Sequence, residues 1–317
     1  MSNKSLTNCT FPVSDFEQVK EKVLNWSNRF STFCFLDNHQ YQIEPHTMEC
    51  LLAAGVKREL KLNAGNAVEQ LAAFRSDNTF LASGWLFGHL GYDLKNEMEK
   101  LSSSNPDGIG FPDLYFFEPE IVIRLSQNEI AIEADDAAGV FNEIGAATDS
   151  VTIPGYLPVL IKSRIGQNEY VSIIQKLKQH ILRGDCYEIN FCQEFYAEDA
   201  MIDPPGVYKK LSAVSPNPFS ALYRVNDHWL ICASPERFLK RKGNNVLSQP
   251  IKGTSKRELW NEEKDRQNKE QLFHSAKDRS ENVMVVDLVR NDLAKICTEG
   301  TVKVDELYGI YSFPQVH

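Results

Sequence analysis

Apolar side chains recur at helical spacing in two parts of the chain. The first stripe is Phe16, Val19, Val23, Trp26 and Phe30, and the second is Val171, Ile174, Leu177 and Ile181. Each stripe places its apolar side chains on one face of a helix. Ser14 and Glu17 have the spacing of a capping box, so the first helix is expected to begin at Ser14. Asn168 is expected to cap the second helix, which Gly184 ends.

Shorter apolar runs and turn residues predict the other elements. Expected strands are 32–36, 80–87, 186–197 and 246–251, and expected helices are 67–74, 258–274 and 277–296. Two hairpins are expected, one joining 121–125 to 129–133 and one joining 219–225 to 229–233. The stretch 135–158 is predicted to be a short helix followed by a loop between the two halves of the chain. Strands in meander order, without regular βαβ alternation, indicate an α+β fold with largely antiparallel sheets.

Composition narrows the class of protein. The chain has 317 residues, a formal net charge of -9 and 42% hydrophobic residues, as expected of a globular protein. The acidic balance disfavours nucleic acid and anionic membranes as partners. The first ten residues have no apolar signal core, and no apolar run approaches the roughly 18 residues of a membrane helix. Seven irregularly spaced cysteines without a C-x-x-C pair favour reduced thiols in a cytoplasmic protein and argue against a zinc site.

Two polar segments lie at expected strand ends. Glu188 and Asn190 follow the glycine that ends a helix and share one strand face, although taken alone they are better explained as a plain helix-to-strand junction. Glu236 follows Pro235, which breaks a strand. Burial would raise the pKa of a carboxyl group at such a place and make it a general acid. The alternative is a glutamate that opens a short helix.

Two further segments carry a candidate nucleophile and a candidate metal ligand. Lys252 precedes Gly253 at a strand end, where a desolvated lysine becomes a nucleophile and the glycine lets a ligand approach the backbone. A surface lysine at a turn is the alternative. Glu281 lies in an apolar helical run that leaves little room for an exposed face. A carboxylate buried there needs a cation, and magnesium takes one or two protein carboxylates with substrate oxygens and water.

Together, these segments resemble a known family. They read G-D-C-Y-E-I-N-F, A-S-P-E-R-F, P-I-K-G-T, K-D-R-S-E-N-V-M-V-V-D-L-V-R-N-D-L and G-T-V-K-V, after an earlier F-G-H-L-G-Y-D. In this order they resemble the chorismate-utilising enzymes, which include anthranilate, aminodeoxychorismate, isochorismate and salicylate synthases. The match is dense from Ile161 onward and looser before it. The resemblance implies one domain, 1–317, with a variable half, 1–150, and a motif-bearing half, 160–317. It also implies two antiparallel sheets packed face to face with helices outside.

One residue selects a branch of that family. Lys252 resembles the lysine of the aminodeoxychorismate synthases, because anthranilate synthases usually have alanine there. The E-N-V-M run after Ser280 agrees, since anthranilate synthases usually read E-H-L-M. The resemblance implies amination of chorismate at C4, toward 4-aminobenzoate and folate. None of the cysteines lies in the strand-to-helix elbow of a glutamine-hydrolysing subunit, so ammonia is expected from a separate glutamine amidotransferase.

The same resemblance assigns roles to residues. It makes Lys252 the nucleophile that adds at C2, and Glu236 the acid that protonates the departing 4-hydroxyl. Gly253 and Thr254 are implied to bind substrate, and Glu281 to hold Mg²⁺ against the ring carboxylate.

Other functions stay open beside this one. Anthranilate synthase and isochorismate-type activity are the alternatives among enzymes, and a non-catalytic chorismate-binding or regulatory subunit is the alternative outside them. The family usually continues for roughly a hundred residues beyond this length, judged from domain size. We therefore expect the sequence to be an incomplete portion of the gene product, with further active-site residues beyond His317.

Overall fold

The computed structural model describes residues 7–42, 46–63, 65–76, 84–148 and 159–317. The chain forms two compact units, and each is described by itself. The larger unit joins Met1–Ser150 to Pro204–His317, and the smaller unit is Val151–Asp203. Within the described residues, no helix is both long and apolar enough to cross a membrane.

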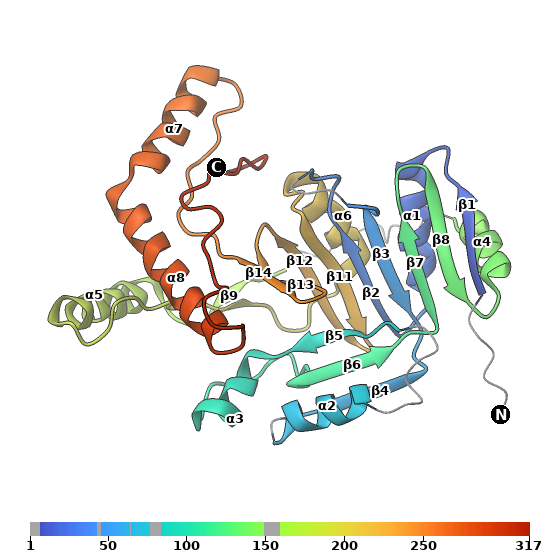
Figure 1. Cartoon of the computed structure of the whole chain (residues 1–317), viewed down its shortest axis with the longest axis horizontal. Helices are drawn as coiled ribbons and strands as arrows, with labels where there is room; N and C mark the ends of the chain where they lie inside the picture. Colours follow the sequence, from blue (N-terminus) through green and yellow to red (C-terminus); the bar gives the residue numbers. More distant parts are fainter. Residues whose placement is uncertain (1–6, 43–45, 64, 77–83, 149–158) are drawn as a thin grey trace. The chain divides into compact units, whose positions relative to one another are not determined.

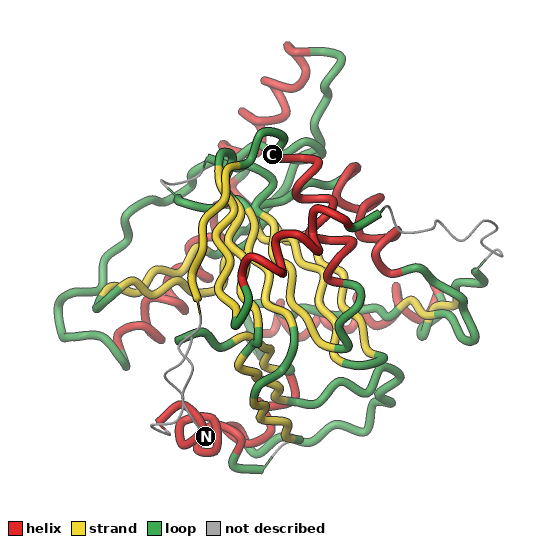
Figure 2. The backbone as a smooth tube through the Cα atoms, turned by 90° about the vertical axis from the view of Figure 1, so that its right-hand side faces the viewer, coloured by secondary structure: helices red, strands yellow, loops and turns green. Residues whose placement is uncertain are grey.

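A seven-stranded sheet forms the centre of the larger unit (Figure 1). All neighbouring strands are antiparallel, and they lie side by side as in Figure 2. Their order is β1 (Thr7–Pro12), β8 (Glu129–Ala134), β7 (Ile121–Leu125), β3 (Cys50–Ala54), β2 (Thr32–Asp37), β11 (Phe219–Val225) and β12 (His228–Ser234).

Alternate residues of this sheet point into two different cores. Phe33 and Phe35 on β2 face a core that the sheet shares with three helices. These helices are α1 (Phe16–Ser27), α4 (Ala137–Ala146) and α6 (Pro204–Val214). Cys34, between the two phenylalanines, faces the opposite core. Both faces of β2 are therefore buried, which explains its nearly unbroken apolar run.

The opposite core lies between two sheets. The second sheet has the order β4 (Arg58–Leu62), β6 (Leu114–Glu118) and β5 (Phe87–Leu90). Phe87, Tyr115 and Phe117 pack from it against Val122 and Tyr223 of the seven-stranded sheet. Face-to-face antiparallel sheets with helices outside are thus confirmed. The far side of the smaller sheet is covered by α2 (Ala67–Ser76), η2 (Tyr92–Leu94) and the chain leading into α3 (Lys95–Glu99).

The remaining elements follow β12 or belong to the smaller unit. After β12 come the hairpin β13 (Arg237–Lys242) and β14 (Asn245–Gln249), and the helices α7 (Glu262–His274) and α8 (Ala276–Ala294). The smaller unit contains α5 (Gln167–Arg183) and the short antiparallel pair β9 (Lys162–Ser163) and β10 (Phe195–Tyr196).

Several sequence predictions are confirmed and others are wrong. The hairpins β7–β8 and β11–β12, the strand β2 and the helix α2 lie where they were expected. The cap of α1 is Asp15 and not Ser14, because the Asp15 side chain accepts the hydrogen bond from the Gln18 N–H. Asn168 does not cap α5, because the helix begins before it with Gly166 as its N-cap. Gly184 ends the helix, as predicted.

The longest predicted strand, 186–197, is wrong. Within the smaller unit only Phe195–Tyr196 is paired, with Lys162–Ser163, so the rest of that segment has no ladder there. Half of the predicted strand 80–87 falls on residues outside the described ranges. Of its described residues only Phe87 is in a strand, where β5 begins, so residues 84–86 were predicted wrongly. The apolar helix α8 has no buried residue, so its expected burial is wrong as well. Among the described elements of the larger unit, α8 contacts α7, and that contact is small.

Candidate active site

Glu236 occupies the junction of two strands. β12 ends at Ser234 and β13 begins at Arg237, with Pro235 between them, as the proline predicted. The Ser234 hydroxyl accepts a hydrogen bond from the Glu236 N–H at 3.2 Å. This local turn fixes the backbone of Glu236, whose side chain is exposed.

The carboxylate of Glu236 reaches the segment that carries Lys252. Its Oε1 accepts a hydrogen bond from the Ile251 N–H at 3.1 Å. Arg237 and Gln249 pair across the hairpin, and the Arg237 guanidinium donates to Gln249 Oε1 at 3.0 Å. The segment after β14 is therefore held beside the start of β13, and half-buried Lys252 directly follows the residue that Glu236 binds.

Gly253 contacts the first turn of α8. Its φ of +78° lies in the left-handed region that favours glycine. A Cβ atom placed on it would lie 2.9 Å from Asp278 Oδ1 and 3.0 Å from Asp278 Cβ, closer than side chains tolerate. Thr254, the next residue, is exposed.

Glu281 lies one turn beyond Asp278 on α8. Its side chain is 29% exposed and pairs with Lys277 at 3.5 Å. Further along the helix, Asp287 pairs with Arg290 at 2.6 Å, and both side chains are exposed.

The segments that carry the predicted catalytic residues are thus in contact through adjacent residues. Glu236 binds the residue before Lys252, and Gly253 packs on the helix that carries Glu281. Whether Glu236, Lys252 and Glu281 face one cavity stays a prediction. Glu188 and Asn190 belong to the smaller unit.

Glu281 is the candidate ligand for a magnesium ion. Among the described residues, no three His, Cys, Asp or Glu side chains cluster closely enough to hold a metal ion. Glu281 offers one partly exposed carboxylate. A single carboxylate suits magnesium, which binds one or two protein carboxylates and completes its coordination shell with substrate oxygens and water. Glu281 therefore fits as a single protein ligand.

A network of ion pairs fixes the chain that follows Thr254. Arg257 donates from Nε to both oxygens of Asp265 at 3.0 Å, and Asp265 also accepts from the Glu258 N–H at 2.7 Å. These hydrogen bonds lower the pKa of Asp265 to about 2. His317 Nε2 lies 3.2 Å from the same carboxylate. Sequence reasoning did not predict this network. Asp265 meets Arg257 and Glu258 only when α7 forms, and His317 comes from a distant part of the chain.

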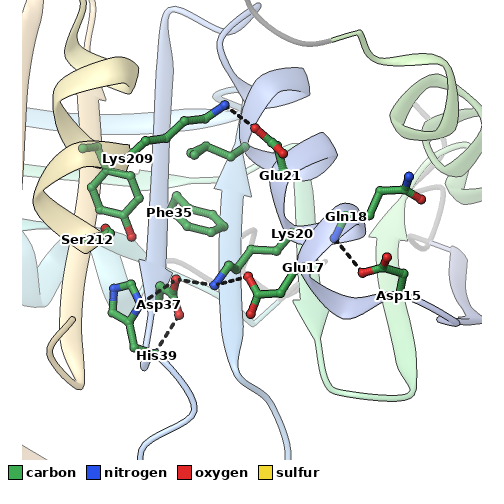
Figure 3. A pocket seen from close by; sticks show the side chains of 12 residues that line it. Asp15, Glu17, Gln18, Lys20, Glu21, Phe35, Asp37, His39, Lys209 and Ser212 are labelled. Carbon is green, nitrogen blue, oxygen red and sulfur yellow. Dashed lines mark hydrogen bonds and ion pairs between the residues drawn. The ribbon is translucent and has the colours of Figure 1, made fainter. Parts of the chain in front are cut away.

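A separate cavity of about 450 Å³ lies against α1, and its lining does not include Lys252 (Figure 3). It surrounds Asp37, whose side chain is 2% exposed and lies 3.4 Å from Lys20 Nζ and 3.5 Å from His39 Nδ1. Burial lowers the pKa of His39, although Asp37 opposes the change. Burial also disfavours the charge of Lys20, but Asp37 and Glu17 together hold its pKa above the ordinary value.

Sequence reasoning missed this cavity. The one available sign was Asp37, a carboxylate that directly follows the apolar run Phe33–Leu36 and ends β2. A charge at the end of a buried strand needs compensation. The compensating Lys20 comes from α1, so only the folded chain brings the two together.

Comparison with known proteins supports the fold and the motifs. The model of the chorismate binding enzyme family matches residues 27–317. An anthranilate synthase component I-like protein of Synechocystis sp. is 34% identical over 239 residues, covering 74% of this chain and 49% of that protein. Aminodeoxychorismate synthase component 1 of Salmonella typhimurium is 31% identical over 237 residues, covering 74% and 52%. The chain spans about half the length of these relatives.

Solved structures agree in fold. The menaquinone-specific isochorismate synthase of Escherichia coli matches with a TM-score of 0.64 at 11% identity, over 98% of this chain and 68% of that one. Anthranilate synthase component I of Streptococcus pneumoniae matches with a TM-score of 0.63 at 20% identity, over 87% and 70%. The family model covers nearly the whole chain, and the strands and helices follow the same fold. The chain is a member of the chorismate-binding enzyme family.

Proposed function

We propose that the chain is the chorismate-binding subunit of an aminodeoxychorismate synthase. This enzyme would convert chorismate and ammonia to 4-amino-4-deoxychorismate, on the route to 4-aminobenzoate and folate. The observation that carries the proposal is the hydrogen bond from the Ile251 N–H to Glu236 Oε1, which joins a carboxyl group to the segment bearing Lys252. A family member with lysine at this position has a nucleophile where the anthranilate synthase pattern usually has alanine.

The proposed chemistry uses two side chains. The neutral Lys252 amine adds to C2 of the ring while Glu236 gives its proton to the 4-hydroxyl, which leaves as water. The two ring double bonds shift in that step. Ammonia then adds at C4, the double bonds shift back, and the Lys252 amine leaves C2. The carboxylate of Glu236 takes the proton that the new amine loses, which restores both groups.

Each group answers a chemical need. Hydroxide is a poor leaving group, so its protonation in the transition state speeds the reaction, typically by about 10²–10⁴-fold. A lysine nucleophile divides one difficult substitution into two easier ones. Magnesium, when held by Glu281, would neutralise the ring carboxylate and draw charge from the ring. Gly253 and Thr254 would contact the substrate from the loop beside Lys252.

Ammonia is proposed to come from a separate glutamine amidotransferase. All seven cysteines are free thiols, and four of them lie within strands: Cys9, Cys34, Cys50 and Cys232. Cys297 follows α8, and Cys186 and Cys192 lie in the smaller unit. A nucleophilic elbow requires a turn from a strand into a helix, and none of these positions offers one among the described residues.

Relatives with the names aminodeoxychorismate synthase and anthranilate synthase match at similar identity, so anthranilate synthase is the second candidate. The test uses the full-length gene product with chorismate and magnesium, with and without ammonia. We expect chorismate to be consumed only with ammonia, and a product that carries one nitrogen. Turnover without ammonia would indicate an isochorismate-type enzyme. Binding without turnover would indicate a regulatory subunit, and full turnover with excess chelator would refute the role of magnesium.

A further inference from the structure

The loop around Lys252 is held on both sides by carboxylate side chains. On one side, Glu236 Oε1 accepts the hydrogen bond from the Ile251 N–H at 3.1 Å. On the other side, the Cα of Gly253 packs on the side chain of Asp278. Lys252 is the single residue between these contacts, so their geometry fixes where its side chain leaves the backbone.

The contact at Gly253 involves the root of the Asp278 side chain. The three nearest atoms to a Cβ at Gly253 would be Asp278 Oδ1 at 2.9 Å, Cβ at 3.0 Å and Cγ at 3.1 Å. Rotation of the carboxylate moves Oδ1 but leaves Cβ in place. A methyl group at Gly253 would therefore have to displace the loop or α8 itself.

Asp278 is held in place from the other side. Ser275 is the N-cap of α8, and its hydroxyl accepts the Asp278 N–H at 3.3 Å. The same hydroxyl donates to Asp278 Oδ2. One carboxylate oxygen is thus engaged by the helix cap, while the other faces Gly253. These two hydrogen bonds hold the Asp278 side chain in one rotamer at the start of α8.

We propose that Asp278 is a positioning residue that sets the backbone of Gly253 and thereby aims the amine of Lys252 at the substrate ring. The inference rests on the proposed function, because it concerns the residue that adds at C2. Asp278 acts through Gly253 and need not touch the substrate. Since Glu281 lies one turn further on α8, the same contact also fixes the distance between the lysine loop and that carboxylate.

A double-mutant cycle tests the contact. Its variants are Gly253→Ala, Asp278→Gly and the two combined, assayed for kcat and for KM with chorismate. We expect Gly253→Ala to lower kcat by about 10²-fold, the usual effect of displacing a reacting group by about 1 Å. Glycine at position 278 removes Cβ as well as the carboxylate and so makes room for the methyl group. The combined variant should therefore recover at least about tenfold in kcat over Gly253→Ala alone. In the Asp278→Gly variant alone, KM should change by less than about threefold, because Asp278 orients the nucleophile and does not bind substrate.

Gly300 supplies a matched control. Its φ is +76°, and a Cβ there would meet no atom within 4 Å. Gly300→Ala therefore introduces the same backbone strain without a collision. It should lower the unfolding midpoint as Gly253→Ala does, leave kcat unchanged, and show no coupling to Asp278→Gly. If Asp278→Gly fails to fold, Asp278→Ala replaces it, because alanine lacks the Oδ1 and Cγ atoms that would lie 2.9 and 3.1 Å from the methyl group.

A second readout does not depend on turnover. Competitive acetylation, read by peptide mass spectrometry, measures the reactivity of the Lys252 amine across pH in each variant. We expect Gly253→Ala to change this profile and the combined variant to restore it. If chorismate is not aminated but this restoration occurs, the proposed function fails and the positioning role stands. If the combined variant is no better than Gly253→Ala in either readout, Asp278 only caps the helix and the inference is overturned.

Discussion

Glu236 accepts a hydrogen bond from the backbone N–H of Ile251 at 3.1 Å, one residue before Lys252. The proposed acid and the proposed nucleophile are thereby joined by a short connection, although Glu236 lies between β12 and β13 and Lys252 follows β14. A carboxyl group in this place has two tasks, to hold the loop and to donate a proton. Substitutions can separate the two.

Glu236→Gln should keep the loop and lose the acid. The amide oxygen of glutamine still accepts the Ile251 N–H, whereas the amide has no proton to give to a leaving hydroxyl. We expect kcat to fall by about 10²–10⁴-fold and the unfolding midpoint to stay within about a degree of wild type. Steady-state kinetics and thermal unfolding measure these effects. Glu270→Gln, on the exposed face of α7, is the control and should be fully active. An active Glu236→Gln enzyme would assign the protonation step to another group.

Lys252→Ala should reduce C4 amination by several orders of magnitude, and Lys252→Arg should not restore it. Addition at C2 needs a neutral amine with a lone pair. Lysine can supply one, but the guanidinium of arginine stays protonated at any working pH. Substrate binding should change less than kcat, since the carboxylate contacts remain. The product is assayed at saturating ammonia, with the exposed Lys242→Ala as control. Wild-type rates from the arginine variant would make Lys252 a charge in the site and not a nucleophile.

Stability should fall as the pH drops from about 7.5 to 5.5, partly because of His89. Its Nε2 lies 2.9 Å from the Pro112 carbonyl oxygen and its Nδ1 lies 3.1 Å from the Tyr223 hydroxyl, a pairing that suits the neutral ring. Burial lowers the pKa of His89 below 6.5. A lowered histidine pKa means that the unfolded chain binds the proton more readily. Its contribution is therefore full above pH 6.5 and is lost as the pH falls toward the folded pKa.

Urea unfolding at several pH values tests this dependence. In His89→Gln, the unfolding free energy should vary less with pH than in wild type. The dependence that remains includes His39, whose pKa burial also lowers. An equal or steeper dependence in the variant would show that His89 does not contribute.

The core between the two sheets should dominate stability. Phe117 on β6 is fully buried among residues of both sheets. Truncation to alanine leaves a cavity and typically costs about 3–5 kcal/mol of unfolding free energy. Phe238 on β13 is 82% exposed, so Phe238→Ala should change that energy by less than about 0.5 kcal/mol. Equal losses in the two variants would contradict the packing of the sheets described above.

Local pairing explains which elements the sequence predicts well. Each strand of the β7–β8 and β11–β12 hairpins finds its partner a few residues away, so alternation and a turn suffice. The segment 186–197 has a similar apolar pattern, but within its unit only two of its residues pair. A strand depends on a partner, and sequence alone does not supply one.

The candidate site was likewise predicted from the sequence only in part. The motifs identified Glu236, Lys252, Gly253 and Glu281, because each stands at a predicted strand end or on a predicted helix. They did not identify Asp278 as the neighbour of Gly253, since that contact joins a loop to a separate helix. Nor did they predict the charge cluster around Asp37, whose partner Lys20 comes from another element.

The position of nitrogen on the ring tests the central claim most directly. The full-length gene product is incubated with chorismate, magnesium and ¹⁵N-labelled ammonia, and the product is examined by NMR for coupling between nitrogen and ring carbon. Addition of Lys252 at C2 blocks that carbon and directs ammonia to C4, so the label is expected on C4 as 4-amino-4-deoxychorismate. In Lys252→Ala, C2 is open, and any residual product should carry the label there. A wild-type product labelled at C2, or anthranilate derived from it, would contradict the assignment of Lys252 as the nucleophile.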